Sequence, residues 1–155
     1  MNSKDVAVRG LRRACTVFLQ DLEALPEEAF ATKFGPKVRT VADIVYEVNV
    51  VNDHLCKVMR GEDAGPWPFE GWVYAPEDFQ SKETVVEAFR KSSESAIADA
   101  ESFTDAQFEE PMQTEGGEPT SRFERFRFLT VHLWYHSGQL NFIQTLLGDD
   151  GWHWS

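Results

Sequence analysis

The clearest helix in this sequence is T-V-A-D-I-V-Y-E-V-N-V-V-N-D-H-L-C-K-V-M-R-G, residues 40–61. Thr40 and the acidic Asp43 form the pattern of a capping box, in which each side chain bonds the backbone of the other residue. Apolar residues then recur at helical spacing on one stripe: Ile44, Val48, Val51, Leu55 and Val58. Gly61 marks the end, because glycine readily adopts the conformation that closes a helix. The stretch therefore predicts an amphipathic helix over 40–60.

Three further segments repeat this helical spacing of apolar residues, and they predict helices over 3–25, 81–103 and 121–147. Pro26 ends the first of them, since proline breaks a helix. Ser121 opens the last one with a second capping box, and Thr104 opens a third, which predicts a short helical turn. No segment alternates with the period of a good strand. The predicted fold class is therefore all-α, a four-helix bundle.

The two longest links between these helices differ in character. Residues 61–80 carry four aromatic side chains: Trp67, Phe69, Trp72 and Tyr74. Two interpretations of this long link stay open, an apolar flap that seals the bundle and a wall of a ligand site. Residues 110–120 are polar and rich in turn residues, and they predict a plain loop.

Length and composition predict one soluble domain over residues 1–155. The chain is 42% hydrophobic and 26% charged, which is ordinary for a globular protein. No apolar run approaches the roughly 20 residues of a membrane span. Residues 1–10 lack the apolar core of a secretion signal, so we expect a cytoplasmic protein.

Charge and cysteine content narrow the function classes. Acidic residues outnumber basic ones by 26 to 15, and the net charge of −11 disfavours nucleic-acid binding. Cys15 and Cys56 lack the C-x-x-C spacing and fall in apolar helical segments. We expect both to be reduced thiols in the core. There is no Ser-His-Asp motif, glycine-rich phosphate loop or dinucleotide fingerprint.

The most informative chemical motif is V-H-L-W-Y-H-S-G-Q-L, residues 131–140. His132 and His136 lie four positions apart, so on a helix their side chains share a face about 6 Å apart along the axis. This spacing suits two ligands of one metal ion, although packed or solvated histidines show it too. His136 falls on the apolar stripe, where a polar side chain needs a partner. Gly138 is best explained by a close approach of another helix.

Glu47 and His54 are the candidates for a third ligand on the helix predicted over 40–60. They lie seven residues apart, about 10.5 Å along the axis, so one metal site can use only one of them. The alternatives without a metal are a solvated carboxylate for Glu47 and a packed histidine for His54.

The sequence resembles the DinB/YfiT-like superfamily over nearly its whole length. The matching features are T-V-A-D-I-V from Thr40, the following Arg60-Gly61, and H-L-W-Y-H-S-G-Q-L from His132. The resemblance implies a four-helix bundle with an unusual connection order and a divalent metal, commonly nickel or zinc, held by three histidines. It places His132 and His136 as two ligands. The third ligand, seven residues after the capping residue, corresponds to Glu47 here instead of histidine.

The resemblance also implies the expected function. Members include thiol-dependent S-transferases, so we expect a metal-dependent enzyme that uses a low-molecular-weight thiol against a small electrophile, or a related hydrolase. The alternative is a non-catalytic stress-response or binding module with a structural or vestigial metal site. The expected ligands are Glu47, His132 and His136, with His54 as the alternative third ligand. Members are often homodimers, and we expect a homodimer with a small-molecule substrate and no nucleic-acid or membrane partner.

Overall fold

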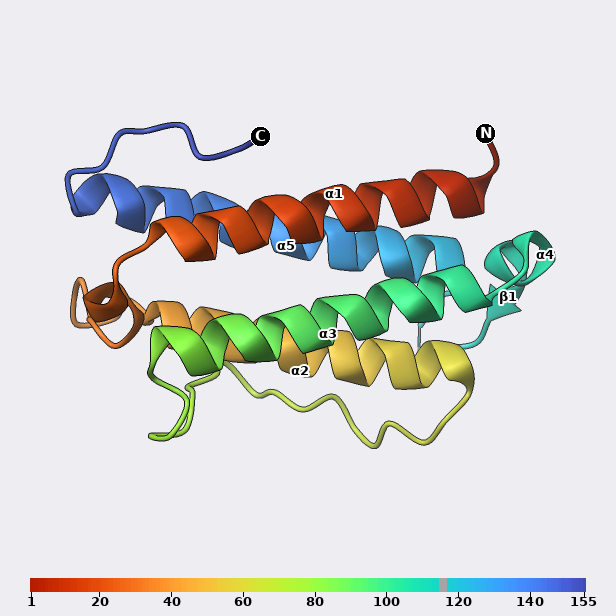
Figure 1. Cartoon of the computed structure of the whole chain (residues 1–155). Helices are drawn as coiled ribbons and strands as arrows, with labels where there is room; N and C mark the ends of the chain where they lie inside the picture. Colours follow the sequence, from red (N-terminus) through yellow and green to blue (C-terminus); the bar gives the residue numbers. More distant parts are fainter. Residues whose placement is uncertain (115–116) are drawn as a thin grey trace.

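The computed structural model describes residues 1–114 and 117–155, and most of its regular structure is helical (Figure 1). Its elements are α1 (Ser3–Ala24), the 3₁₀ turn η1 (Glu27–Phe30), α2 (Val41–Arg60), α3 (Lys82–Ser102), α4 (Asp105–Glu109), β1 (Pro111–Met112), β2 (Thr120–Ser121) and α5 (Arg122–Leu146). The all-α fold is confirmed, and the four long helices end within one residue of their predicted bounds. None of the helices in these ranges has the length and apolar character of a membrane span.

The four long helices pack as a bundle in which neighbours are not always antiparallel (Figure 1). α1 packs against α3 and α5, and α2 packs against the same two helices. α2 and α3 run parallel, because Asn52 contacts Ser92 and Arg60 pairs with Asp99 further along both helices. A chain that continues into a parallel neighbour must first return along the bundle. This return explains the long link over residues 61–81.

The core lies between the helices and is built mainly from the predicted apolar stripes, with Met59 buried in place of Val58. The largest fully buried side chains are Phe18, Phe30, Phe89, Phe108, Phe126, Leu11, Leu22, Leu25, Met59, Leu129, Leu133 and Leu140. Their removal from water is the main favourable contribution to folding. Leu147, the last residue of the helix predicted over 121–147, is 39% exposed and lies just beyond the end of α5 at Leu146.

The predicted helix ends are confirmed in detail. All three capping boxes are present, at Thr40, Thr104 and Ser121, and α4 is the short turn that the second of these predicted. Gly61 ends α2 in the left-handed conformation, with a φ of 76°. These ends depend on residues within one helical turn of each other, which is why the sequence alone could place them.

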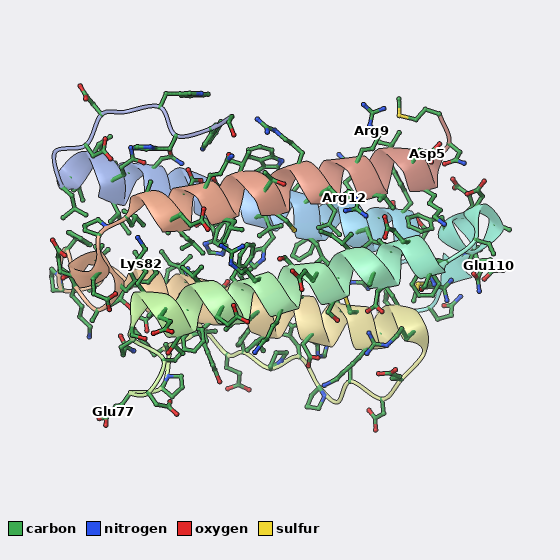
Figure 2. The ribbon with its side chains drawn as sticks, viewed as in Figure 1. Asp5, Arg9, Arg12, Glu77, Lys82 and Glu110 are labelled. Atoms are coloured by element: carbon green, nitrogen blue, oxygen red, sulfur yellow. The ribbon has the colours of Figure 1, made fainter. Side chains whose placement is uncertain are left out.

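Two lysines join α1 and α3 at opposite ends. Neither helix has a basic residue in its own last turn. Lys82 Nζ donates to the carbonyls of Glu23 and Leu25 at the end of α1, at 2.8 and 2.6 Å (Figure 2). Lys4 Nζ donates to the carbonyl of Phe103 at the end of α3, at 2.6 Å. A cation is favourable at a helix C-terminus, so these contacts stabilise the antiparallel pairing of α1 and α3.

The prediction of a plain loop over 110–120 is wrong at its two ends. Pro111 and Met112 pair antiparallel with Ser121 and Thr120, respectively. A pairing of two residues is too short to show the alternation by which strands are predicted. Residues 115–116 of this link lie outside the described residues.

The aromatic link between α2 and α3 lies beside α2 (Figure 1). Phe69 and Phe79 pack against the core, and the Ala75 N–H donates to Asp43 Oδ1 at 2.8 Å. Trp67 and Trp72 stay 48% and 63% exposed. Part of the link therefore covers the core, as one interpretation held, and the place of Trp72 is described with the site below.

Gly61→Ala is expected to destabilise the protein, while Gly10→Ala stabilises it. Alanine is strained at the φ of 76° that Gly61 adopts. We expect the free energy of unfolding to fall by about 1 kcal/mol or more. Gly10 lies inside α1, where an added methyl group would stand 3.7 Å from Thr130 in ordinary contact. There we expect a gain of about 0.4–1 kcal/mol. Urea unfolding of both variants measures the two changes in the free energy of unfolding. Changes of the same sign would contradict the prediction.

Candidate metal centre

Glu47, His132 and His136 meet between α2 and α5, and one ligand atom from each lies within 4.8 Å of the others. The Nε2 atoms of His132 and His136 lie 3.3 and 3.5 Å from Glu47 Oε1. The two Nε2 atoms are themselves 2.9 Å apart. His136 is completely buried, and the other two residues are half-buried. Among the described residues, this is the group that could hold a metal ion.

The antiparallel packing of α2 and α5 creates this meeting point. His132 and His136 stand one turn apart on α5, and Glu47 lies on the facing turns of α2. Ser137, the residue after His136, donates a hydrogen bond to Asp21 of α1. Trp154 Nε1 donates to the same carboxylate at 2.7 Å. These contacts hold this part of α5 between its two neighbours.

A second contact orients the His136 ring. His136 Nδ1 lies 2.7 Å from Gln139 Oε1, an acceptor, so Nδ1 carries the proton and donates it. In this tautomer Nε2 presents its lone pair toward His132 and Glu47. Histidines that bind metal ions are commonly held by such a hydrogen bond from the other ring nitrogen. Two imidazole nitrogens and one carboxylate oxygen converge here, and this donor set fits zinc or nickel.

Arg39 holds the Glu47 carboxylate from its other side. Its guanidinium donates to Glu47 Oε2, which leaves Oε1 facing the histidines. Burial alone would raise the pKa of Glu47, but its contacts with His132 and His136, the hydrogen bond from Arg39 and the charge of Arg39 hold this pKa well below its usual value. Glu47 is therefore ionised, the form that binds metal. Sequence reasoning gave Arg39 no role, although its position directly before the Thr40 cap places it beside the first turns of α2.

The structure does not bring His54 to this group. His54 lies two turns further along α2 and packs edge-on against Trp67 of the aromatic link, with ring centroids 5.2 Å apart. This contact matches the alternative of a packed histidine. Neither does the structure offer a reactive cysteine, because burial raises the pKa of both Cys15 and Cys56 to about 12.

A cavity of about 440 Å³ lies next to the three residues. Arg39, which bonds Glu47, and Gln139, which bonds His136, both line it. Trp72 of the aromatic link lines it too and lies over Arg39, whose guanidinium carbon is 4.5 Å from the ring centroid. The interpretation of the link as a wall of a possible ligand site thus applies to Trp72, while Trp67 contacts His54.

Gly138 also lines this cavity, and its predicted role is wrong. We expected a close approach of another helix at this glycine. Apart from its chain neighbours and the adjacent backbone of α5, no heavy atom of the described residues lies within 4 Å of the position that a Cβ would take. The missing side chain leaves open space at the cavity instead of room for a packed helix.

The profile of the DinB superfamily matches residues 11–140 of the chain. The chain belongs to the DinB superfamily. The helical bundle is also that of solved DinB-like proteins. A conserved protein from Enterococcus faecalis is 16% identical, with a TM-score of 0.73 over 96% of this chain and 99% of that one. A DinB-like protein from Bacillus cereus is 17% identical, with a TM-score of 0.69 over 92% and 91% of the two chains. At this identity, the DinB-like structures establish the fold alone. No curated protein matches the chain.

Proposed function

We propose that this member of the DinB superfamily is a divalent-metal-dependent enzyme in which Glu47, His132 and His136 hold zinc or nickel. The observation that carries the proposal is the convergence of three ligand atoms within 4.8 Å at a largely buried point. Two nitrogens and one oxygen also leave a coordination position for a small molecule. Buried polar groups need compensating partners, and a metal ion can supply one to all three residues at once.

The proposed chemistry is transfer of a low-molecular-weight thiol to a small electrophile. When bound, the metal ion would lower the pKa of the thiol and favour its nucleophilic form. The residues around the site orient the proposed ligands. Gln139 fixes the orientation of the His136 ring, and Arg39 binds the Glu47 oxygen that does not face the histidines. The thiols of the protein are buried and protonated, so activation of an added thiol fits better than covalent catalysis. Metal-assisted hydrolysis is the related alternative.

A non-catalytic binding or stress-response module is the second candidate, and the ion pair between Arg39 and Glu47 favours it. This pair satisfies the carboxylate within the protein itself. A charge that already has a buried partner needs no metal ion to compensate its burial. In this candidate the histidine site is structural or vestigial.

Metal content and turnover together separate the two candidates. We expect protein purified without chelator and dialysed against Zn²⁺ or Ni²⁺ to retain one ion per chain. It should accelerate the reaction of a thiol with 1-chloro-2,4-dinitrobenzene, in which sulfur replaces chloride and the thiol proton passes to solvent. A chelator should abolish the activity, and the ion should restore it. A protein that never retains metal, and whose stability is the same with and without the added ion, would support the non-catalytic module.

We also propose a cytoplasmic homodimer that uses the outer face of α5. This face carries a row of exposed apolar residues: Phe128, Val131, Tyr135, Phe142 and Leu146. Contiguous exposed apolar residues commonly mark an interaction surface. Sedimentation equilibrium at tens of micromolar is expected to give twice the chain mass, and a monomer at that concentration would contradict the homodimer.

A further inference from the structure

The lining of the cavity beside the metal centre carries cations and no carboxylate, although the protein is acidic. Lys37 and Arg39 line the cavity, and none of its lining residues is acidic. The whole chain carries 26 acidic and 15 basic residues, so a lining with two cations and no carboxylate departs from the general pattern. Glu47 compensates the charge of Arg39, so Lys37 is the cation of the lining that attracts an anion and repels a cation.

The two cations differ in what they can still bind. Arg39 is 7% exposed and donates one hydrogen bond, from Nη1 to Glu47, among the described residues. Lys37 is exposed, and within residues 1–114 and 117–155 no carboxylate forms an ion pair with it. The ammonium of Lys37 is therefore the group best placed to bind an anionic group of a ligand.

The remaining walls are apolar. They are formed mainly by Val38, Ile44, Trp72, Tyr135, Phe142 and Ile143. The volume of about 440 Å³ lies within the range of small-molecule sites, which are usually apolar with a few polar groups that fix orientation. Such walls suit a hydrocarbon or aromatic body.

The absence of a side chain at Gly138 leaves the cavity unfilled on the α5 side. Glycine inside a helix costs about 1 kcal/mol relative to alanine. Packing does not explain this cost at Gly138, since no other helix or side chain among the described residues, its two chain neighbours apart, lies within 4 Å of its Cβ position. Any larger side chain on this turn of α5 would extend into the space.

We propose that this cavity binds a small carboxylate with an apolar body, with its charged group at Lys37 and its body against Trp72 and Gly138. The inference rests on the proposed function for the idea that a substrate enters here, and it adds the charge and shape of that substrate. Binding itself requires only the residues of the cavity and no metal ion.

Calorimetry on metal-free protein tests the proposal with three matched probes: 4-phenylbutyrate, 4-phenylbutanol and 4-phenylbutylamine. We expect phenylbutyrate to bind about tenfold more tightly than the alcohol, since it adds one charge-assisted hydrogen bond, and the amine to bind most weakly. Lys37→Gln should remove the preference for the carboxylate, and Lys37→Glu should reverse it in favour of the amine. Lys33→Gln, an exposed lysine outside the lining, should leave all three affinities unchanged.

Gly138→Leu provides an independent test of the position. The added side chain should fill the cavity and abolish phenylbutyrate binding, while circular dichroism confirms the fold. Equal affinities for the carboxylate and the alcohol, an unchanged preference in Lys37→Gln, or normal binding by Gly138→Leu would each overturn the proposal. Wild-type protein that binds none of the three probes would also overturn the proposal. Metal titration of the same samples tests the proposed metal site separately. Protein that binds the metal ion but no phenylbutyrate contradicts the cavity proposal alone, and protein that binds phenylbutyrate but no metal ion contradicts the metal site alone.

Discussion

His132→Ala and His136→Ala are each expected to empty the metal centre. Each removes one of three ligands, and loss of a group that merely orients a ligand already costs about 10–100-fold in metal affinity. We therefore expect a loss beyond about 100-fold from removing a ligand itself. Glu47→Ala should weaken binding strongly, because it removes the only negatively charged donor among the three. Metal content after dialysis against Zn²⁺ or Ni²⁺ measures each loss.

His54→Ala is the matched control for these variants. Its ring packs against Trp67 and not with the three donors, so the metal content should stay at the wild-type level. If His54→Ala empties the centre and Glu47→Ala does not, the assignment of the third ligand is wrong. Circular dichroism of all four variants separates loss of a ligand from loss of the fold.

Phe18→Ala is expected to cause the largest loss of stability, about 3–5 kcal/mol. Phe18 is completely buried, and its ring packs against Phe89 of α3 with centroids 4.7 Å apart. Alanine leaves a cavity between α1 and α3 that the surrounding helices can fill only in part. Urea unfolding monitored by circular dichroism measures the free energy of unfolding.

Val6→Ala serves as the control for that measurement, since Val6 of α1 is 48% exposed and lies outside both the cavity and the outer face of α5. We expect its free energy of unfolding to stay within about 0.5 kcal/mol of the wild type. A similar loss in the two variants would show that Phe18 does not join α1 to α3 as described.

The helices were predictable because their signals are local. Thr40 and Asp43 lie within one helical turn, and Gly61 ends the same helix through its own backbone conformation. Apolar side chains at helical spacing also indicate which face is buried before any neighbour is known. These interactions connect residues a few positions apart, so the order of the sequence contains them.

The candidate centre was predictable in part. His132 and His136 share a helix, so their proximity follows from their spacing. Glu47 came from the register of the family resemblance, and the residues alone left His54 equally open. Only the packing of α2 against α5 distinguishes the two, because it sets which turn of α2 faces the histidines.

The sequence by itself determined the four helices, their ends, their buried faces and the histidine pair. Tertiary structure decided that α2 and α3 run parallel, that Arg39 holds Glu47, and that Gly138 opens onto a cavity. The physical reason is the range of the interactions. Caps and helical spacing act within a few residues, whereas these three features arise where segments distant in sequence pack together, and many arrangements of the same helices would satisfy the local signals equally.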